Sequence, residues 1–507
     1  MDILTHTVYE FFRPRQHKIA RFTEEAEPIQ KQQLRWLWRM ASHTEWGVQH
    51  DFEHLSQYSD YKNRFPVQTY DEIKGDIERM VRGETDVLWP GTCRWFAKSS
   101  GTTSDKSKFL PVTPAILRRA HYQGGFDTVS LYLRNYPESH FFSRKGLILG
   151  GSHAPSPLHA GTRCGDLSAV LLQNLNPLVD LVRVPKREII LMDEWEHKIK
   201  AIVESTWRED VNSLSGVPSW MLVLIKAILQ KAGKTCLTEV WPNLEVFFHG
   251  GISFEPYRAQ YQQLIPSDKM HYMETYNASE GFFGLQDDPS DHSLLLMLDY
   301  GIFYEFIPLD ELDSDNPHVF PLWEVEAGKN YALVISTAGG LWRYLIGDTV
   351  RFTSTHPYKF IISGRTKHYI NAFGEELMVN NAERAIQMAC QATGAKVKEY
   401  TAAPLFLLDK AKGRHQWLIE FTQAPRSLTE FARLLDSFLQ QVNSDYEAKR
   451  YKEISLQPLE VIPAREDCFY DWLKAKGKLG GQHKIPRLSN DRQVLEELLQ
   501  FNALHSI

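Results

Sequence analysis

The sequence predicts an α/β fold in which a large N-terminal domain precedes a smaller α+β domain. Short apolar runs that end in Gly, Ser or Thr alternate with helical stretches, a pattern typical of buried strands joined by helices. Near residues 359–377 the pattern changes to a helix followed by two strand-like segments of small-domain size. With 507 residues, the chain is also long for one hydrophobic core. We therefore predict domains at 1–363 and 364–507.

Residues 1–90 carry a charged helical periodicity. In EAEPIQKQQLRWLWRMA, we expect Ile29, Leu34, Leu37 and Met40 to lie on one buried stripe. The N-terminal stretch mixes acidic and basic residues and has no apolar core segment, unlike a signal peptide. These features predict a cytoplasmic protein.

Three apolar runs are predicted to be buried strands that deliver loops to one edge of a sheet, where α/β proteins bind ligands. They are KGLILGG (145–151), LEVFFHGG (244–251) and KNYALVIST (329–337). The stretches 194–208 and 219–232 are predicted helices between the first two strands.

The predicted C-terminal domain begins where Gly364-Arg365-Thr366 separates two apolar runs. Helices are expected at 381–393 and at about 427–443. Strand-like segments at 400–409 and 415–422 lie between them.

The composition narrows the class of protein. Hydrophobic residues are 43% and charged residues 24%, which is typical of a globular protein. A net charge of −6 gives no electrostatic case for a nucleic acid or an anionic membrane as partner. The five cysteines lie far apart, and neither a CxxC nor an HExxH motif occurs, so we expect no disulfide framework and no dedicated metal cage.

The densest cluster of small and hydroxyl-bearing residues lies in WFAKSSGTTSDKSKFLPVT, residues 95–113. From Ser99 to Lys108, seven of ten positions are Ser, Thr or Gly. Such a loop can point several backbone N–H groups toward a phosphate chain. It is not a Walker A loop, because the second glycine of that motif is missing. Ser/Thr/Gly clusters also form ordinary loops, so the residues alone leave both readings open.

Two later stretches offer groups suited to a nucleotide. The glycine pair in HGGISF (249–254) would let the backbone approach a flat ligand, although a simple strand-terminal turn explains it as well. In METYNASEGFFG (273–284), Ser279 and Glu280 could serve a magnesium-bound phosphate. The alternative there is a helix N-cap with a solvated glutamate.

A third stretch is GGLWRYLIGDTVRF, residues 339–352. Its Asp348, at a strand end, could accept hydrogen bonds from both ribose hydroxyls. The alternative is a hairpin, for which Gly347-Asp348 is common turn chemistry.

The order of these stretches, with a small domain behind them, resembles the adenylate-forming superfamily of acyl-CoA synthetases, luciferases and peptide-synthetase adenylation domains. Four segments are similar in sequence to motifs of the auxin-responsive family of acyl acid–amido synthetases. They are FAKSSGTTSDKSKFLPVT, YNASEG, WRYLIGD and GGQHKIPRL. The resemblance covers about residues 35–495. It implies a large adenylate-forming α/β domain with a hinged C-terminal domain.

The resemblance also implies roles for individual residues. The phosphate-binding loop would be Ser99, Ser100, Gly101, Thr102 and Thr103. The adenosine would contact Gly250, Gly251 and Tyr276 through its base and Asp348 through its ribose. Ser279 and Glu280 would contact the α-phosphate and Mg²⁺. Arg365 would lie at the hinge between the domains and help to hold the nucleotide, and Lys484 would reach the reacting phosphate and carboxylate.

Two positions depart from the family pattern. Asp105 stands where the family has glycine, and its charge is unfavourable beside a triphosphate unless it faces away or helps to hold Mg²⁺. Leu345 replaces the arginine of the usual Tyr-Arg-Leu-Gly-Asp, while Arg343 lies on the other side of the tyrosine. An arginine contact to phosphate at this position is therefore in doubt.

An acyl pocket is expected between the helix after the loop and the strand ends around Leu149–His153 and Leu171–Leu172. The candidate substrate contacts are Leu117, Tyr122, Phe126 and His153. They are mostly apolar, as for a flat or aliphatic acid. Plain helix–sheet core is the alternative.

The resemblance implies an ATP- and Mg²⁺-dependent ligase that adenylates a small carboxylic acid and transfers the acyl group to the amine of an amino acid. The alternatives are an acyl-CoA ligase and a nucleotide-binding scaffold without turnover. No nucleic acid or membrane partner is expected. A phosphotransferase is disfavoured because no catalytic aspartate motif accompanies the loop.

Overall fold

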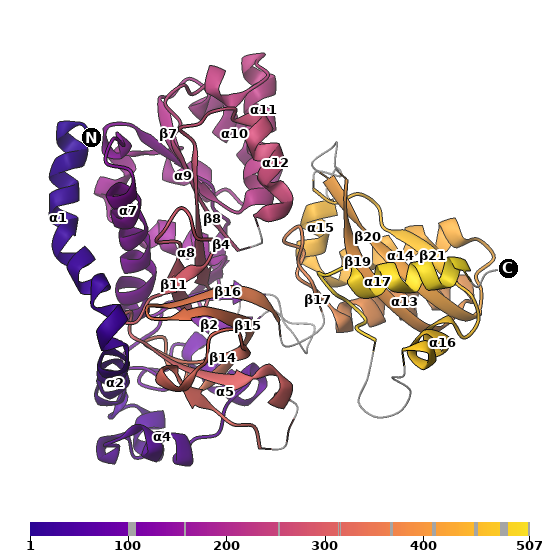
Figure 1. Cartoon of the computed structure of the whole chain (residues 1–507), viewed down its shortest axis with the longest axis horizontal. Helices are drawn as coiled ribbons and strands as arrows, with labels where there is room; N and C mark the ends of the chain where they lie inside the picture. The colour runs from indigo at the N-terminus through magenta and orange to yellow at the C-terminus, as the bar shows by residue number, and fades with distance from the viewer. Residues whose placement is uncertain are drawn as a thin grey trace. The chain divides into compact units, whose positions relative to one another are not determined.

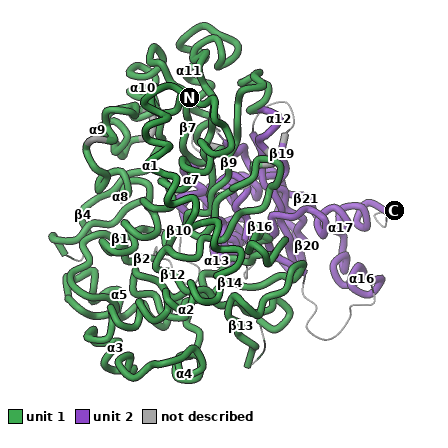
Figure 2. Tube along the Cα trace, turned by 60° about the vertical axis from the view of Figure 1, so that its left-hand side comes forward, with its two compact units in different colours: residues 1–99, 107–254, 261–366 green, residues 100–106, 255–260, 367–507 purple. Residues whose placement is uncertain are grey.

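The computed structural model describes residues 1–99, 108–156, 159–251, 254–312, 314, 316–365, 369–407, 412–450, 455–476 and 485–504 (Figure 1). Its two compact units are coloured separately in Figure 2. The larger unit holds the described residues up to Arg365 except Glu255–Gln260, which belong with the residues from Tyr369 onward in the smaller unit. The predicted fold class, a large α/β domain followed by a smaller one, is confirmed. The exact boundary at residue 363 stays a prediction.

The larger unit is built on a twelve-stranded mixed sheet, counted over the described residues. The strand order is β13-β12-β14-β15-β16-β11-β10-β9-β8-β7-β3-β6. The bounds are β3 Lys145–Ile148, β6 Arg183–Val184, β7 Val211–Gly216, β8 Val246–Gly250, β9 His271–Ala278, β10 Gly281–Leu285, β11 Leu294–Leu296, β12 Ile302–Pro308, β13 Phe320–Pro321, β14 Asn330–Thr337, β15 Tyr344–Thr355 and β16 Tyr358–Arg365.

Strands β6, β3, β7, β8 and β9 run parallel, and the strands from β9 to β13 in the sheet order pair antiparallel. Parallel neighbours need crossover connections, and helices α8 to α12 supply them in the chain. Their bounds are α8 Leu167–Asn174, α9 Arg187–Ile190, α10 Trp195–Thr206, α11 Pro218–Ala232 and α12 Glu255–Leu264. The helices expected at 194–208 and 219–232 are thus confirmed as α10 and α11.

The expectation that 329–337 is a strand of the same kind as 145–151 and 244–251 is only partly right. All three are strands, but β14 pairs antiparallel with both β12 and β15. Parallel and antiparallel strands that are buried on both faces have the same continuous apolar pattern, so the sequence does not distinguish them.

A second, four-stranded sheet of the larger unit has the order β2-β1-β5-β4. Its strands are β1 Trp95–Ser99, β2 Lys108–Pro111, β4 His153–Pro155 and β5 Arg163–Gly165. Strands β1 and β2 pair antiparallel with Ser99 opposite Lys108. The two ends of the Ser/Thr/Gly stretch are therefore neighbours in the sheet.

The remaining helices of the larger unit lie mostly before β1. They are α1 Ile3–Ala20, α2 Phe22–Ala41, α3 Glu45–Gln49, α4 Tyr58–Arg64, α5 Tyr70–Val81, α6 Pro114–Ile116 and α7 Gln123–Asn135, with a π-helical turn at Leu117–Tyr122 between the last two. The backbone of α1 begins at Asp2, whose carboxylate accepts the N–H groups of Leu4 and Thr5. This is a standard N-cap, and it lowers the pKa of Asp2 to about 2 through hydrogen bonds that outweigh desolvation.

The buried stripe predicted on α2 is only partly correct. Leu34 and Leu37 are buried and Ile29 packs at the edge of the core, but Met40 is 41% exposed. Because successive helical residues are about 100° apart, a buried face centred on Leu37 places Met40 at its margin.

Two glutamines also lie on the buried face of α2. Gln30 donates to the carbonyls of Leu298 and Ile302 at 2.8 and 3.0 Å, and its amide oxygen accepts the N–H of Tyr304. Gln33 accepts the N–H of Gly301 at 3.1 Å. The buried face of α2 is therefore partly polar because it supplies hydrogen bonds to the backbone at the start of β12.

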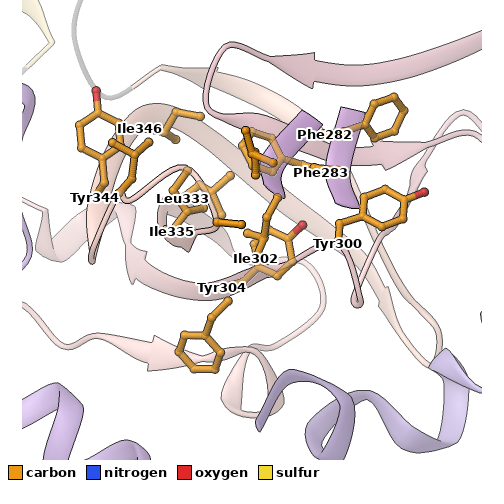
Figure 3. Close-up of a cluster of buried hydrophobic side chains, with 14 of the residues drawn as sticks. Phe282, Phe283, Tyr300, Ile302, Tyr304, Leu333, Ile335, Tyr344 and Ile346 are labelled. Carbon is orange, nitrogen blue, oxygen red and sulfur yellow. The ribbon is translucent and has the colours of Figure 1, made fainter. Parts of the chain in front are cut away.

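The core beside these strands is shown in Figure 3. Aromatic and aliphatic side chains from β10, β12, β14 and β15, and from the turn before β12, gather there. The labelled members are Phe282, Phe283, Tyr300, Ile302, Tyr304, Leu333, Ile335, Tyr344 and Ile346. This cluster supports the antiparallel half of the large sheet from which the candidate site is built.

In the smaller unit, β19 Lys396–Leu407, β20 Lys412–Gln423 and β21 Glu460–Ala464 form a sheet, and β17 Tyr369–Ile370 pairs with β18 Leu377–Met378. Its helices after residue 369 are α13 Val379–Thr393, α14 Leu428–Val442, α15 Ser444–Arg450, α16 Cys468–Ala475 and α17 Gln493–Leu504. The helices expected at 381–393 and 427–443 correspond to α13 and α14, and the strands expected at 400–409 and 415–422 to β19 and β20, with residues 408–409 outside the described part of the chain. Gly394, with φ of 72°, ends α13 in the left-handed conformation that glycine tolerates best.

Candidate functional site

The structure brings three predicted site segments together at one part of the large sheet. Gly250 ends β8, and it pairs with Thr275 of β9. The turn between β9 and β10 carries Glu280, and Asp348 lies in β15. Since Tyr276 of β9 is hydrogen-bonded to Asp348, these segments share one location in the larger unit.

Gly250 is required by its close approach to the next strand. A Cβ atom at this position would lie 2.3 Å from the carbonyl oxygen of Thr275. Gly251 follows with φ of 84°, a conformation that favours glycine. Backbone geometry alone thus accounts for the glycine pair, and its contact with adenine stays a prediction.

Tyr276 and Asp348 form a buried pair. Their exposed fractions are 7% and 8%, and the tyrosine hydroxyl donates to Oδ2 of the aspartate. The tyrosine ring packs edge-on against Phe283, with ring centroids 4.9 Å apart, and lies 6.1 Å from the ring of Phe360. The resemblance placed both residues against one nucleotide, and the structure places them in direct contact.

The hairpin reading of Gly347-Asp348 is wrong. Strand β15 runs without interruption from Tyr344 to Thr355, and its register against β14 shifts between Leu345 and Thr349. Gly347 has φ of 97°, so the pair lies in a bulge of a continuous strand. A bulge redirects side chains locally, and Asp348, whose Cα partner on β16 is Arg365, lies in this one.

The helix N-cap reading of Ser279 and Glu280 is also wrong. Ala278 at the end of β9 pairs with Gly281 at the start of β10, so Ser279 and Glu280 form a two-residue hairpin turn. Glu280 is 9% exposed, and Ser279 is half-buried. A largely buried carboxylate in a turn is a stronger candidate for a functional group than a solvated one.

Part of the predicted site lies outside the described residues. Ser100, Gly101, Thr102, Thr103 and Lys484 belong to that part. Ser99 and Arg365 are described by their backbone, as the last residues of β1 and β16. Beside the loop, the ammonium group of Lys108 lies 5.4 Å from the ring centre of Tyr70, and the Tyr70 hydroxyl accepts the N–H of Phe109 at 2.9 Å.

Arg343 has a structural partner inside the core. Its exposed fraction is 3%, and its guanidinium bonds both carboxylate oxygens of Glu305, which is fully buried, at 3.1 and 3.0 Å. Nη1 donates to the carbonyls of Lys62 and Phe65, and Tyr58 donates to Glu305 at 2.8 Å. These bonds hold the side chain in the core. Arg343 therefore does not supply the phosphate contact expected of the family arginine, whose position is occupied here by Leu345.

Three of the segments expected to line an acyl pocket lie next to one another. Leu117 is buried, and the Tyr122 hydroxyl donates to the carbonyl of Leu171 at 3.0 Å, which joins the helix to the 171–172 segment. Near Leu149, a Cβ on Gly150 would lie 2.5 Å from Cδ1 of Leu172. The helix and the strand end therefore meet the same segment, and an acyl pocket between them stays a prediction.

Two of the candidate substrate contacts have other neighbours. The ring of Phe126 packs edge-on against Phe12 of α1, with ring centroids 4.2 Å apart. His153 packs against Trp95 at 5.1 Å, and burial lowers the pKa of His153. These packing contacts neither support nor exclude a contact with the acid. The roles of Phe126 and His153 in binding it stay predictions.

His121 is a residue of this region that the sequence analysis missed. It lies in the π-helical turn, is 3% exposed, and its Nδ1 is 2.8 Å from Oδ1 of Asn277, two residues before Ser279. Nε2 is buried with no hydrogen-bond partner among the described residues. Because Nδ1 faces an oxygen, the neutral ring carries its hydrogen there. Burial lowers the pKa of His121 to about 4.

This burial predicts a pH dependence of stability. Between pH 6.5 and 4 the unfolded chain binds a proton that native His121 does not, so the free energy of unfolding falls with falling pH, by about 3 kcal/mol over the window. His121→Gln should remove this contribution, and His17→Gln, at an exposed site on α1, should not. Urea unfolding at several pH values measures the difference. Parallel profiles for wild type and His121→Gln would contradict the prediction.

Among the described residues, no group of three or more His, Cys, Asp or Glu side chains could hold a metal ion. None of the helices in the described part of the chain has the length and apolar character needed to cross a membrane.

Comparison with solved structures identifies the fold. Over 96% of its length, this chain is similar to the AtGH3.15 acyl acid amido synthetase in complex with 2,4-DB, with a TM-score of 0.60, 18% identity and 95% of that chain covered. It is also similar to a 2-hydroxyisobutyryl-CoA ligase in complex with 2-HIB-AMP and CoA, with a TM-score of 0.57, 14% identity and coverages of 96% and 93%. The fold is that of the adenylate-forming ligases.

Within that class, the chain belongs to the GH3 family. The models of the GH3 family N-terminal, central and C-terminal domains match residues 15–270, 295–365 and 380–493. The indole-3-acetic acid-amido synthetase GH3.3 of Arabidopsis thaliana is 23% identical, with 95% of this chain and 93% of the relative covered. The 4-substituted benzoates-glutamate ligase GH3.12 of the same plant is also 23% identical, with coverages of 86% and 88%. The predicted family is confirmed, and the fold matches that of the predicted superfamily.

Proposed function

We propose that this protein is an ATP-dependent ligase that joins a small carboxylic acid to the amine of an amino acid. The observation that carries the proposal is the match of three consecutive GH3 family domains along the chain. The fold of adenylate-forming ligases implies ATP as the nucleotide. The buried Tyr276–Asp348 pair and the turn with Glu280 supply polar groups at the place where the family resemblance expects that nucleotide.

The chemistry has two steps. In the first, a carboxylate oxygen of the acid attacks the α-phosphorus of ATP, the bond to the β-phosphate oxygen breaks, and pyrophosphate leaves. The product is an acyl-adenylate, in which AMP is a good leaving group. In the second, the amine attacks the acyl carbonyl, AMP leaves with the bonding electron pair, and the amine loses a proton as the amide forms.

The protein contributes positioning and charge neutralisation rather than covalent help. Asp348 would accept hydrogen bonds from the ribose hydroxyls, and Gly250 and Gly251 would allow the backbone to approach the base. The loop from Ser99 to Thr103 would hold the phosphates, and Ser279 would contact the α-phosphate. Lys484 would neutralise the reacting oxygens.

The chain fits a Mg²⁺ ion that is shared with the nucleotide. Mg²⁺ prefers one or two carboxylates together with phosphate oxygens and waters, and Glu280 is a largely buried carboxylate in the turn at the site. Such an ion would offset negative charge on the phosphates. Glu280 would be the residue that holds it.

One experiment tests both which acid is adenylated and which acceptor receives the acyl group. The protein is incubated with ATP, a panel of aromatic and aliphatic acids, and either a mixture of amino acids or CoA, and the products are separated by mass. We expect an amide with an amino acid and release of pyrophosphate. A thioester would assign an acyl-CoA ligase, and no pyrophosphate with any acid would assign a scaffold without turnover.

Lys484→Ala is expected to slow pyrophosphate release about a hundredfold, because a preorganised charge that stabilises the transition state is lost. The matched control is Lys474→Ala, since Lys474 is exposed near the end of α16 of the same unit. The rate is measured at saturating ATP with the best acid. An equal rate for the two variants would remove Lys484 from the proposed machinery.

A further inference from the structure

The loop after β3 leaves the large sheet at the edge where β7 and β8 also end. Ile148 of β3 lies opposite Ser215 of β7, and Gly216 of β7 lies opposite His249 of β8. Ligands of α/β proteins bind beyond this edge of a parallel sheet. Strands β3 and β8 are two inter-strand spacings apart, which is about 10 Å. A small carboxylic acid can span that distance, between the loop after β3 and the nucleotide contact predicted at Gly250.

The loop consists of Gly150 and Gly151, which pack too closely against their neighbours to carry a side chain. A Cβ atom on Gly150 would lie 2.5 Å from Cδ1 of Leu172, and one on Gly151 would lie 1.9 Å from Oδ2 of Asp166. The N–H of Gly151 donates to the hydroxyl of Ser168 at 2.9 Å. Helix α8 and the residue before it thus hold the loop through its Cα atoms and one amide.

Lys198 of α10 holds the carbonyl groups of the same loop. Its ammonium group donates to the carbonyl of Gly150 at 2.7 Å and to that of Gly151 at 3.1 Å. In the part of the chain that the structure describes, no other group donates to these two carbonyls. Their hydrogen bonds therefore depend on this one side chain.

The charge of Lys198 is buried. Its exposed fraction is 3%, and none of the described side chains forms an ion pair with it. A buried ammonium group without an ion-pair partner costs stability, and an apolar side chain would fill the same space at lower cost. The charge at this position therefore indicates a function beyond packing.

We propose that Lys198 is a positioning residue for the acid substrate: its ammonium group holds the Gly150-Gly151 loop in the conformation that binds the acid beside the nucleotide. This inference rests on the proposed function. Lys198 acts through the loop and does not touch the reacting atoms. Loss of the ammonium group leaves two buried carbonyls without a donor, so the loop rearranges to satisfy them. Binding of the acid then weakens, while the nucleotide contacts on other strands keep their geometry.

Lys198→Met is the first test, with pyrophosphate release by the full chain as the readout and the acid that gives the most amide as the substrate. The KM for the acid should rise about tenfold, because charge-assisted hydrogen bonds to the loop are lost, with kcat and the KM for ATP unchanged. Lys200→Met is the matched control, since Lys200 is exposed on the same helix. It should change neither KM.

The dependence on pH is the second test. Burial lowers the pKa of Lys198 to about 8, although the nearby Asp166 and Asp193 favour the charged form. Carboxylates in general do not titrate between pH 7 and 9. Because a neutral amine makes weaker hydrogen bonds than an ammonium group, the KM of wild type for the acid should rise about fivefold over this range.

Lys198→Gln separates the charge from the hydrogen bonds. It keeps N–H donors for the carbonyls and does not titrate, so its KM for the acid should lie between those of wild type and Lys198→Met and stay constant from pH 7 to 9. Because this variant keeps donors to the loop, it also serves if Lys198→Met does not fold. A lysine with a purely structural role would change stability without changing the ratio of the two KM values or its pH dependence.

Three results would overturn the inference alone. They are an unchanged KM for the acid in Lys198→Met, an equal rise of the KM values for acid and ATP, and the same pH dependence of the KM for the acid in wild type and Lys198→Gln. A wild type that releases no pyrophosphate with any acid would overturn the proposed function, and this inference with it.

Discussion

Asp348→Ala is expected to raise the KM for ATP by about three orders of magnitude. The proposed contact is a pair of hydrogen bonds from the ribose hydroxyls to one carboxylate. Bonds to a charged group contribute about 2 kcal/mol each, and about 4 kcal/mol corresponds to roughly a thousandfold in affinity. The low exposure of Asp348, 8%, limits compensation by water. The measurement is pyrophosphate release as a function of ATP concentration with a fixed acid.

The control for this prediction is Asp291→Ala. Asp291 accepts the hydroxyl of Ser293 at 2.6 Å and the ammonium group of Lys359 at 3.1 Å, so the variant also loses a carboxylate with partners in the larger unit. It should leave the KM for ATP unchanged. Asp348→Asn adds a second check, since it keeps the shape of the side chain and removes its charge. An unchanged KM in Asp348→Ala would exclude the ribose contact.

Arg343→Met is expected to lower the free energy of unfolding by about 4 kcal/mol. The arginine is the partner of Glu305, which is fully buried, and without it the carboxylate is left in the core beside Tyr58. Removing one partner of a buried ion pair costs about 3 to 5 kcal/mol because the other charge stays uncompensated. The carbonyls of Lys62 and Phe65 also lose their donor. Urea unfolding followed by circular dichroism measures the change.

Two further variants separate the buried charge from the general effect of a substitution. Arg351→Met, at an exposed position of the same strand β15, should change stability by less than about 0.5 kcal/mol. The double variant Arg343→Met/Glu305→Leu should be more stable than Arg343→Met alone, because the uncompensated carboxylate is gone. A double variant that is less stable than the single one would show that packing, and not charge, dominates at this position.

The local elements were largely predictable from the residues. The apolar runs at 145–151, 244–251 and 329–337 are strands, and the helices at 194–208 and 219–232 are α10 and α11. These patterns depend on residues that are near one another in the chain. The errors arose where a local pattern has two solutions, as at Gly347-Asp348, which is a bulge in a strand rather than a hairpin turn.

From the residues alone, most of the elements, the family and a set of candidate nucleotide contacts could be predicted. Only the tertiary structure decided their partners: Tyr276 with Asp348, 72 residues apart, Arg343 with Glu305, and His121 with Asn277, 156 residues apart. The physical reason is that helical and strand periodicities reflect burial on one face, whereas strand order, twist and bulges decide which distant side chains meet. Those long-range contacts turn a set of candidate residues into an oriented site.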